Sequence, residues 1–225
     1  MKCECKCGIR LAREGANQII ISLLLLVAAV LGVWFHRSRC TRWLFFGATV
    51  WAVAVLQFFR DPKRLPPRGE GLILSPADGR IIAVDPPLGT PLSKSRRRVS
   101  IFMSPLNAHV NRSPVEGKVV EVNRYPGKFL SAFKPEAERE NERVEIKMST
   151  SYGEVTFCQV AGYLARRIVF HPRPGDTLTA GERVGMIRYG SRVDVYLPAN
   201  VHLFVSLGQK VWAGETILGE FADAV

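Results

Sequence analysis

Two uncharged stretches dominate the hydrophobic pattern near the N-terminus. Residues 19–35 contain no charged side chain, and residues 43–59 form a second such stretch after a basic break at residues 36–42. Each lies near the short end of the roughly 17–25 residues that a transmembrane helix needs, and Trp34 and Trp43 stand near their ends, as interfacial tryptophans do. A signal peptide would need a small-residue cleavage site before the second stretch, and none is present. The pattern predicts a membrane-anchoring helical hairpin over residues 19–59, either spanning the bilayer or lodged shallowly in it.

The hydrophobic pattern changes after a proline-rich, charged linker at residues 60–69. From residue 70 onward, short runs of β-branched and apolar residues alternate with glycine, proline and aspartate, a pattern typical of strands and turns. The clearest runs are residues 71–75, 80–84, 99–103, 118–122, 144–148, 154–160 and 192–197. Residues 135–143 are polar and predict a loop or a short helix. We therefore expect a basic tail (1–18), the hairpin (19–59), the linker (60–69) and one β-rich domain (70–225).

An internal repeat refines the predicted fold. Residues 175–182 and 208–215 both read Gly, four variable residues, then Ala-Gly-Glu, and each copy is followed by apolar residues and a glycine. Two copies are too few for a solenoid. They are typical of a barrel-sandwich hybrid with pseudo-twofold halves, the architecture of biotinyl and lipoyl domains. Residues 75–81 and 114–119 predict matching turns of the same sheet system.

The net charge of +11 has two interpretations. A basic protein can bind nucleic acid, but much of this charge borders the apolar stretches, where anionic lipid headgroups are the simpler partner. We expect a membrane partner and no nucleic acid. The basic residues before and after the hairpin slightly outnumber those between the helices, which favours both ends, and the β-rich domain, on the cytoplasmic side of the cell membrane.

Five cysteines do not form a recognisable framework. Cys3, Cys5 and Cys7 alternate in the tail without the paired spacing or nearby histidines of a metal cluster, while Cys40 and Cys158 are isolated. We expect reduced thiols and no metal site, and acylation of the tail cysteines stays open.

Three local features are candidates for chemistry. His109 lies between two Ser-Pro turns in a polar stretch, residues 104–114, that also holds two amides and a guanidinium. Asp78 lies in Pro-Ala-Asp-Gly, which on local signal alone favours a plain turn. The Gly190–Ser191 bond stands between two apolar runs, where a strained turn would open the Gly190 carbonyl to the Ser191 hydroxyl. Motifs for metal proteases, nucleotide binding and serine hydrolases are missing from the sequence.

Taken together, these segments resemble the phosphatidylserine decarboxylase proenzymes, in particular their short bacterial and archaeal form. The resemblance runs from about residue 58 to the C-terminus, and the hydrophobic hairpin also fits the family. It rests on residues 75–79 (Ser-Pro-Ala-Asp-Gly), 103–112, 140–143 (Glu-Asn-Glu-Arg) and 188–194. Several motifs in the right order are far more specific than any one of them.

The resemblance implies that the chain cuts itself at Gly190–Ser191. Ser191 Oγ would attack the Gly190 carbonyl to give an ester, and β-elimination would release residues 1–190 as a β chain. The dehydroalanine left at position 191 would hydrolyse, with loss of ammonia, to a pyruvoyl group on the α chain, residues 191–225. The pyruvoyl carbonyl would form a Schiff base with the amine of phosphatidylserine and accept the electrons released with CO2, yielding phosphatidylethanolamine. The two chains would form a heterodimer, and homo-oligomerisation stays open.

The resemblance also assigns roles to individual residues. His109 matches the family's proton-transfer histidine, and Asp78 matches an aspartate associated with processing. Longer members carry a second histidine where this chain has Arg112, so the processing base stays open between His109 and backbone strain. Arg112, Arg143 and Arg192 are candidates for holding the substrate phosphate, with solvated surface arginines as the alternative.

The alternative function is a non-catalytic, membrane-anchored barrel-sandwich adaptor or prosthetic-group carrier. A carrier needs an exposed lysine at the turn between its half-repeats, and residues 188–192 contain none. A zinc endopeptidase on a similar fold lacks a ligand set.

Overall fold

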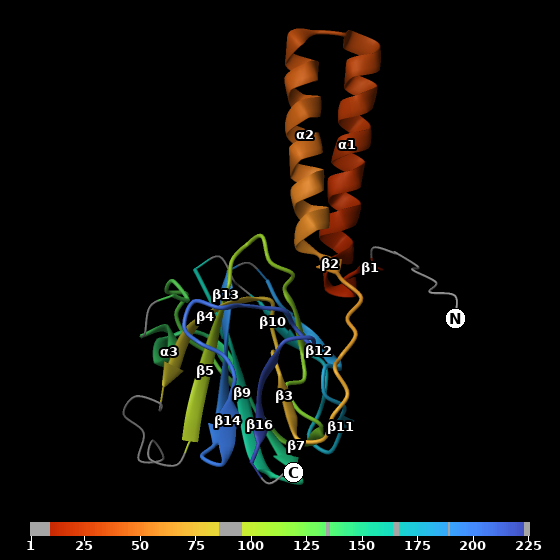
Figure 1. Cartoon of the computed structure of the whole chain (residues 1–225). Helices are drawn as coiled ribbons and strands as arrows, with labels where there is room; N and C mark the ends of the chain where they lie inside the picture. The colour runs from red at the N-terminus through yellow and green to blue at the C-terminus, as the bar shows by residue number, and fades with distance from the viewer. Residues whose placement is uncertain (1–9, 86–95, 134–135, 164–166, 189, 223–225) are drawn as a thin grey trace, which may run out of the picture. The chain divides into compact units, whose positions relative to one another are not determined.

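The computed structural model describes residues 10–85, 96–133, 136–163, 167–188 and 190–222 (Figure 1). The chain divides into two compact units, residues 1–63 and 64–225. The boundary falls inside the proline-rich segment at residues 60–69. The three tail cysteines lie outside the described residues.

The first unit is a helical hairpin. Helix α1 (Ala16–His36) follows a short 3₁₀ turn, η1 (Arg13–Gly15), and lies alongside helix α2 (Arg39–Phe58) (Figure 1). Both helices are longer than the uncharged stretches. Helix α2 begins early because Ser38 caps it, its hydroxyl accepting a hydrogen bond from the Thr41 backbone N–H at 3.2 Å. A two-residue strand pair, β1 (Arg10–Leu11) with β2 (Arg60–Asp61), closes the base of the hairpin.

Most apolar side chains of the hairpin face outward. Trp34 and Trp43 are 67% and 74% exposed, while a few residues such as Ala52 and Val55 are buried. By length and composition both helices suffice to cross a membrane. An apolar surface of this extent is unusual in a soluble unit and is compatible with membrane association.

The second unit is built from antiparallel strands in three sheets (Figure 1). The largest sheet has eight strands in the order β11-β7-β8-β9-β13-β5-β4-β15. Its strands, in that order, are Thr177–Leu178, Gly117–Tyr125, Arg143–Thr150, Gly153–Ala161, Ser191–Pro198, Arg96–Met103, Gly79–Asp85 and Lys210–Val211. The two smaller sheets are β10-β12-β6 (Ile168–Phe170, Arg183–Ile187, Val110–Arg112) and β14-β16-β3 (Val201–Leu203, Ile217–Phe221, Leu72–Leu74).

One hydrophobic core lies between the large sheet and the two small ones. It takes alternate residues of the central strand β13, namely Val193, Val195 and Leu197, together with side chains from the small sheets such as Ile187 and Leu218. Because side chains of a strand alternate between faces, Arg192, Asp194 and Tyr196 lie on the opposite, outer face. Helix α3 (Ala137–Glu140) belongs to the polar segment at residues 135–143, as expected.

The internal repeat is visible as pseudo-twofold symmetry. Its two copies supply β11 and β15, which form the two opposite edges of the large sheet. The predicted turns also match: the Ser75 hydroxyl donates to the Ala77 carbonyl, and the Ser113 hydroxyl donates to the Val115 carbonyl, both at 2.7 Å. The described strands form sandwich-like sheets without closing a barrel. The prediction of a mainly β, barrel-sandwich-like fold with an N-terminal helical hairpin is confirmed.

Candidate active site

Ser191 is the first residue of the central strand β13. It pairs with Met103 of β5 on one side and with Ala161 of β9 on the other. Its side chain belongs to the core-facing set and is fully buried. The hydroxyl donates a hydrogen bond to Met103 Sδ at 3.3 Å. A thioether is a weak acceptor, so this contact holds the buried hydroxyl only weakly.

Gly190 has a backbone conformation that favours glycine. Its φ angle of 51° lies in the left-handed region, where a side chain adds strain. Its carbonyl group approaches the backbone of Gly162 so closely that a Cβ at position 162 would overlap the Gly190 oxygen. Glycine is therefore favoured at position 190 by its φ angle and required at position 162 by the close approach of the Gly190 carbonyl. Sequence reasoning missed Gly162, although a glycine directly after a β-branched strand is the signal for such an approach.

Asn141 holds the chain next to Gly162. Its buried side-chain amide donates to the Ala161 carbonyl at 2.7 Å and to the Leu130 carbonyl at 2.8 Å, and its oxygen accepts from the Leu130 N–H at 2.9 Å. The motif at residues 140–143 thus supports the site through an asparagine.

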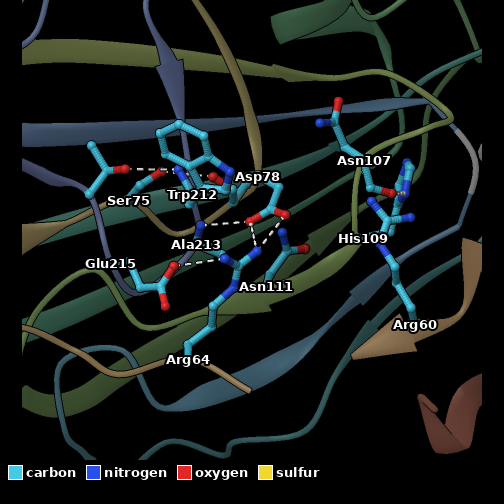
Figure 2. A network of polar contacts seen from close by, with 12 residues as sticks. Arg60, Arg64, Ser75, Asp78, Asn107, His109, Asn111, Trp212, Ala213 and Glu215 are labelled. Carbon is cyan, nitrogen blue, oxygen red and sulfur yellow. Dashed lines mark hydrogen bonds and ion pairs between the residues drawn. The ribbon is translucent and has the colours of Figure 1, made fainter. Parts of the chain in front are cut away.

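His109 lies immediately before strand β6. Its ring is fully buried, and Nδ1 is 2.9 Å from the Asn107 carbonyl oxygen (Figure 2). A carbonyl only accepts, so Nδ1 carries the proton of the neutral ring and Nε2 is the basic nitrogen. The His109 carbonyl accepts from the Ile187 N–H at 3.3 Å. Strand pairing therefore places His109 beside the end of β12, the strand that leads to the Gly190–Ser191 bond.

Two buried amides complete this part of the core. Gln159 Nε2 donates to Asn111 Oδ1 at 2.8 Å, and Asn111 Nδ2 lies 3.7 Å from Met103 Sδ. Contacts thus connect Ser191, Met103, Asn111 and Gln159, all fully buried. Asn111 and Gln159 were not predicted as site residues. Asn111 lies inside the motif at residues 103–112, but the amide of Gln159 has no local sequence signal.

Asp78 forms a buried ion pair with Arg64 (Figure 2). Its two carboxylate oxygens accept from Arg64 Nη2 at 2.8 and 2.7 Å, and Oδ1 also accepts from the Ala213 N–H at 2.8 Å. Arg64 Nη1 binds Glu215 at 2.7 Å. The carboxylate therefore ties the segment after the hairpin to the turn before β16. A role of Asp78 in processing stays a prediction.

Arg192 is not a surface residue. Its guanidinium is buried on the outer face of the large sheet and pairs with Asp194, with Nη2 and Nε 2.9 and 3.0 Å from Oδ2. Glu138 of helix α3 also binds Arg98, and its Oε1 accepts from the Tyr196 hydroxyl at 2.8 Å. Burial raises the pKa of the Asp194 carboxyl, and the nearby Arg192 charge and a hydrogen bond from Ser100 partly offset this.

Comparison with known sequences identifies the family. A sequence model described as phosphatidylserine decarboxylase matches residues 51–219. The chain belongs to the phosphatidylserine decarboxylase family. This confirms the resemblance expected from the motifs, and because the family consists of decarboxylases it favours an enzyme over an adaptor or carrier.

Similar proteins named phosphatidylserine decarboxylase proenzyme occur in several bacteria. One from Chlorobium chlorochromatii is 44% identical over 211 residues, covering 94% of this chain and 100% of that protein. One from Nitrosomonas eutropha is 48% identical over 185 residues, covering 79% and 86%. One from Pelobacter propionicus is 50% identical over 165 residues, covering 73% and 75%. The family match at residues 51–219 includes most of the β-rich unit, and the similarity to the Chlorobium protein covers nearly the whole chain.

The three arginines expected to hold substrate in this family member are not gathered at one point. Arg192 and Arg143 both pair with Val160 of β9, from opposite sides, and so stand two strands apart. Arg143 stacks on the Tyr125 ring at 4.3 Å, and Arg112 donates to the Gly181 carbonyl at 3.1 Å. Their role in phosphate binding stays a prediction.

The described part of this family member holds no cluster of three His, Cys, Asp or Glu that could bind a metal. Cys40 is exposed and Cys158 is buried, and neither forms a disulfide. Burial raises the pKa of the Cys158 thiol well above its usual value, which disfavours a reactive thiolate.

Proposed function

We propose that this chain is a membrane-attached phosphatidylserine decarboxylase that converts phosphatidylserine to phosphatidylethanolamine and CO2. Its cofactor would be a pyruvoyl group that the chain makes from Ser191 by cutting its own Gly190–Ser191 bond. The observation that carries the proposal is the backbone at this bond. A left-handed Gly190, whose carbonyl lies close against the Gly162 backbone, directly precedes a buried serine.

The cut begins with attack of Ser191 Oγ on the Gly190 carbonyl carbon. A C–O bond forms, the Gly190–Ser191 C–N bond breaks, and the amine of residue 191 takes up a proton. Loss of the Cα proton then breaks the Cβ–O bond and releases residues 1–190 with a C-terminal carboxylate. Elimination leaves a double bond between Cα and Cβ of residue 191, beside its free amine. This enamine rearranges to an imine, which water hydrolyses to a ketone with release of ammonia. No external oxidant or reductant is needed.

The residues around position 191 fit such a group. Met103 contributes an apolar wall, and the buried Asn111 and Gln159 amides lie behind it. A pyruvoyl group is smaller than serine and has no hydroxyl, so it can occupy the same space. When formed, it supplies a carbonyl that condenses with an amine and withdraws the electrons released as CO2 leaves.

His109 is the proton-transfer group in this proposal. Its Nδ1 is anchored on the Asn107 carbonyl, which leaves Nε2 as the basic nitrogen, and its backbone is bonded to the strand that precedes the cut. A buried imidazole of fixed orientation can move a proton without waiting for solvent. Ser191 is fully buried in the uncut chain, so the cut must also open a path by which a lipid headgroup reaches position 191.

The helical hairpin supports the proposed membrane location, since both helices are long and apolar enough to cross a bilayer. The charge distribution around the hairpin favours the β-rich unit on the cytoplasmic side. The α and β chains would stay together as a heterodimer.

Intact mass spectrometry with a denaturing gel tests the proposal. The purified chain should consist of two fragments separated after residue 190, with the smaller one bearing a pyruvoyl group in place of serine. Ser191→Ala should remain one chain and release no CO2 from phosphatidylserine. A folded protein that decarboxylates the lipid with an intact Ser191 would overturn the proposed cofactor, and a folded, uncut and inactive protein would favour the adaptor.

A further inference from the structure

Two cations face each other at one edge of the large sheet. Lys210 of edge strand β15 pairs directly with Arg80 of β4. Directly opposed like charges destabilise an antiparallel pair, so an acidic partner between them would be expected. Instead, the Arg80 guanidinium donates to a backbone carbonyl, that of Gly208, at 2.7 Å. Within the described part of the chain, no ion pair joins either cation to a carboxylate.

The two cations line a pocket of about 550 Å³. Strand pairing places Arg80, through Phe102, on the same outer face of the sheet as Arg192. The described residues that line it include no aspartate or glutamate. Ser104 and Asn107 contribute hydroxyl and amide groups at one side. A pocket with two uncompensated cations and neutral hydrogen-bonding groups is complementary to a phosphate group.

Aromatic side chains surround the cations. Phe133 and Trp212 line the same pocket and are 64% and 52% exposed. Phe133 packs edge-on against Phe102, with 5.7 Å between ring centres, so it is held at the rim. Exposed aromatic rings beside basic residues are typical of surfaces that enter the headgroup layer of a membrane.

The pocket is poorly placed for the phosphate of the reacting lipid. In phosphatidylserine four bonds of about 1.5 Å join the amine nitrogen to phosphorus, a span of about 5 Å. Arg80 lies two strands from β13, about 10 Å at a spacing of about 4.8 Å per strand. Its guanidinium is bonded to the Gly208 carbonyl, next to β15 and away from β13. Ser191 alternates with Arg192 along β13 and faces the core, whereas Arg80 pairs with Phe102, which pairs with Arg192, on the outer face.

We propose that this pocket binds the phosphate of an anionic membrane phospholipid other than the reacting one, and that it docks the outer face of the β-rich unit on the bilayer. The proposal rests on the proposed membrane location, but it does not depend on the chemistry at Ser191. Trp212 and Phe133 would enter the interface while Arg80 and Lys210 hold the phosphate.

The test uses the full-length Ser191→Ala chain in neutral maltoside micelles, so that no reaction takes place. Dihexanoyl-phosphatidylglycerol is titrated, and the tryptophan fluorescence change that is lost in Trp212→Phe is taken as binding. We expect saturable binding that weakens about tenfold in Arg80→Gln/Lys210→Gln. Lys118→Gln, which removes one exposed cation elsewhere on the sheet, should bind as the parent does.

Three outcomes would overturn the proposal. Equal weakening in Lys118→Gln would mean general attraction to a basic surface. An equal response to dihexanoyl-phosphatidylcholine would mean that the cations play no part. Equal binding of inorganic phosphate, displacing the lipid, would identify a site for free phosphate. None of these results bears on decarboxylation, which is measured on the wild-type chain, so the two proposals fail independently.

Discussion

The hydroxyl of Ser191 on β13 lies 3.3 Å from the sulfur of Met103, its directly paired neighbour on β5. This contact orients the proposed nucleophile but binds it weakly, because sulfur is a poor acceptor. The hydroxyl can therefore turn toward the Gly190 carbonyl at little cost.

Met103→Leu tests this relationship. Leucine keeps the volume but leaves a buried hydroxyl without an acceptor, which costs about 1–3 kcal/mol in the uncut chain. We expect the chain to be cut at least as fast as the wild type, as followed on denaturing gels after cell-free synthesis. Loss of cutting in a folded variant would show that the sulfur has a direct part in the reaction.

Gly162→Ala should slow the cut at least tenfold, equivalent to about 1.4 kcal/mol in the barrier. The added Cβ would displace the Gly190 carbonyl from its position. The matched control is Gly117→Ala, where a Cβ would press on the Ser149 carbonyl elsewhere in the sheet. Both variants should lose stability, but only Gly162→Ala should accumulate uncut chain. Equal cutting rates in Gly162→Ala and Gly117→Ala would show that Gly162 does not position the Gly190 carbonyl for the cut.

His109→Gln should lower decarboxylation by about 10²–10⁴-fold, the usual contribution of a general acid or base. The amount of cut chain is measured in the same preparation. Normal cutting with lost decarboxylation assigns His109 to proton transfer alone, whereas an uncut chain assigns it to both steps. Normal decarboxylation would contradict the proposed role.

Asp78→Asn separates a structural role from a processing role. Removing one charge of a buried pair costs about 3–5 kcal/mol, so Asp78→Asn and Arg64→Gln should lower the thermal midpoint by similar amounts. If Asp78 acts only through this pair, both variants should be cut equally well once folded at low temperature. A block confined to Asp78→Asn would establish its part in processing.

Asp194 should make the protein less stable as pH rises, the opposite of a carboxylate whose pKa is lowered by folding. Because its pKa is raised above the ordinary value of an aspartate, 3.8, the folded state binds its proton more tightly than the unfolded state. The free energy of unfolding should therefore fall as pH rises from about 4 through the raised pKa, and then level off. The titratable and charged groups near this carboxylate include Arg192, Arg98, Cys158, Glu138 and Tyr196, and Ser100 donates a hydrogen bond to it.

The difference between Ser191→Ala and Ser191→Ala/Asp194→Asn isolates this group. Urea unfolding of both chains between pH 4 and pH 8 should show a steeper fall in the parent. Lys147 lowers the pKa of Glu121 in a surface ion pair. This pair is present in both chains, so its contribution to the pH dependence drops out of the difference between them. Parallel curves would show that Asp194 is not protonated more readily in the folded state.

The sequence was sufficient for the architecture because the fold follows from short-range patterns. Alternating β-branched runs gave the strands, and the Ala-Gly-Glu repeat anticipated that β11 and β15 take equivalent positions at opposite sheet edges. Ser113 and Ser75 form equivalent turns for the same reason. Such features are local, and each repeats a residue pattern that can be read along the chain.

The surroundings of the site depend on strand pairing and could not be read in this way. Gly162 matters only because β9 lies next to β13, and Gln159 reaches Asn111 across the core. Arg192 looked like a surface cation, but its alternation with core residues places it under helix α3, where Asp194 and Glu138 surround it. Burial of a charged residue is decided by what covers it, and the covering segment is distant in sequence.

The position of β13 has a consequence for the lifetime of the protein. A fragment beginning at residue 191 would carry β13 and β15 of the large sheet and β14 and β16 of a small one. It therefore contributes strands to both sheets. Folding of the uncut chain is a first-order event, whereas two separated fragments would have to meet again in a concentration-dependent encounter. The mature enzyme would then fold only once, and its working life would be set by the rate at which it first unfolds.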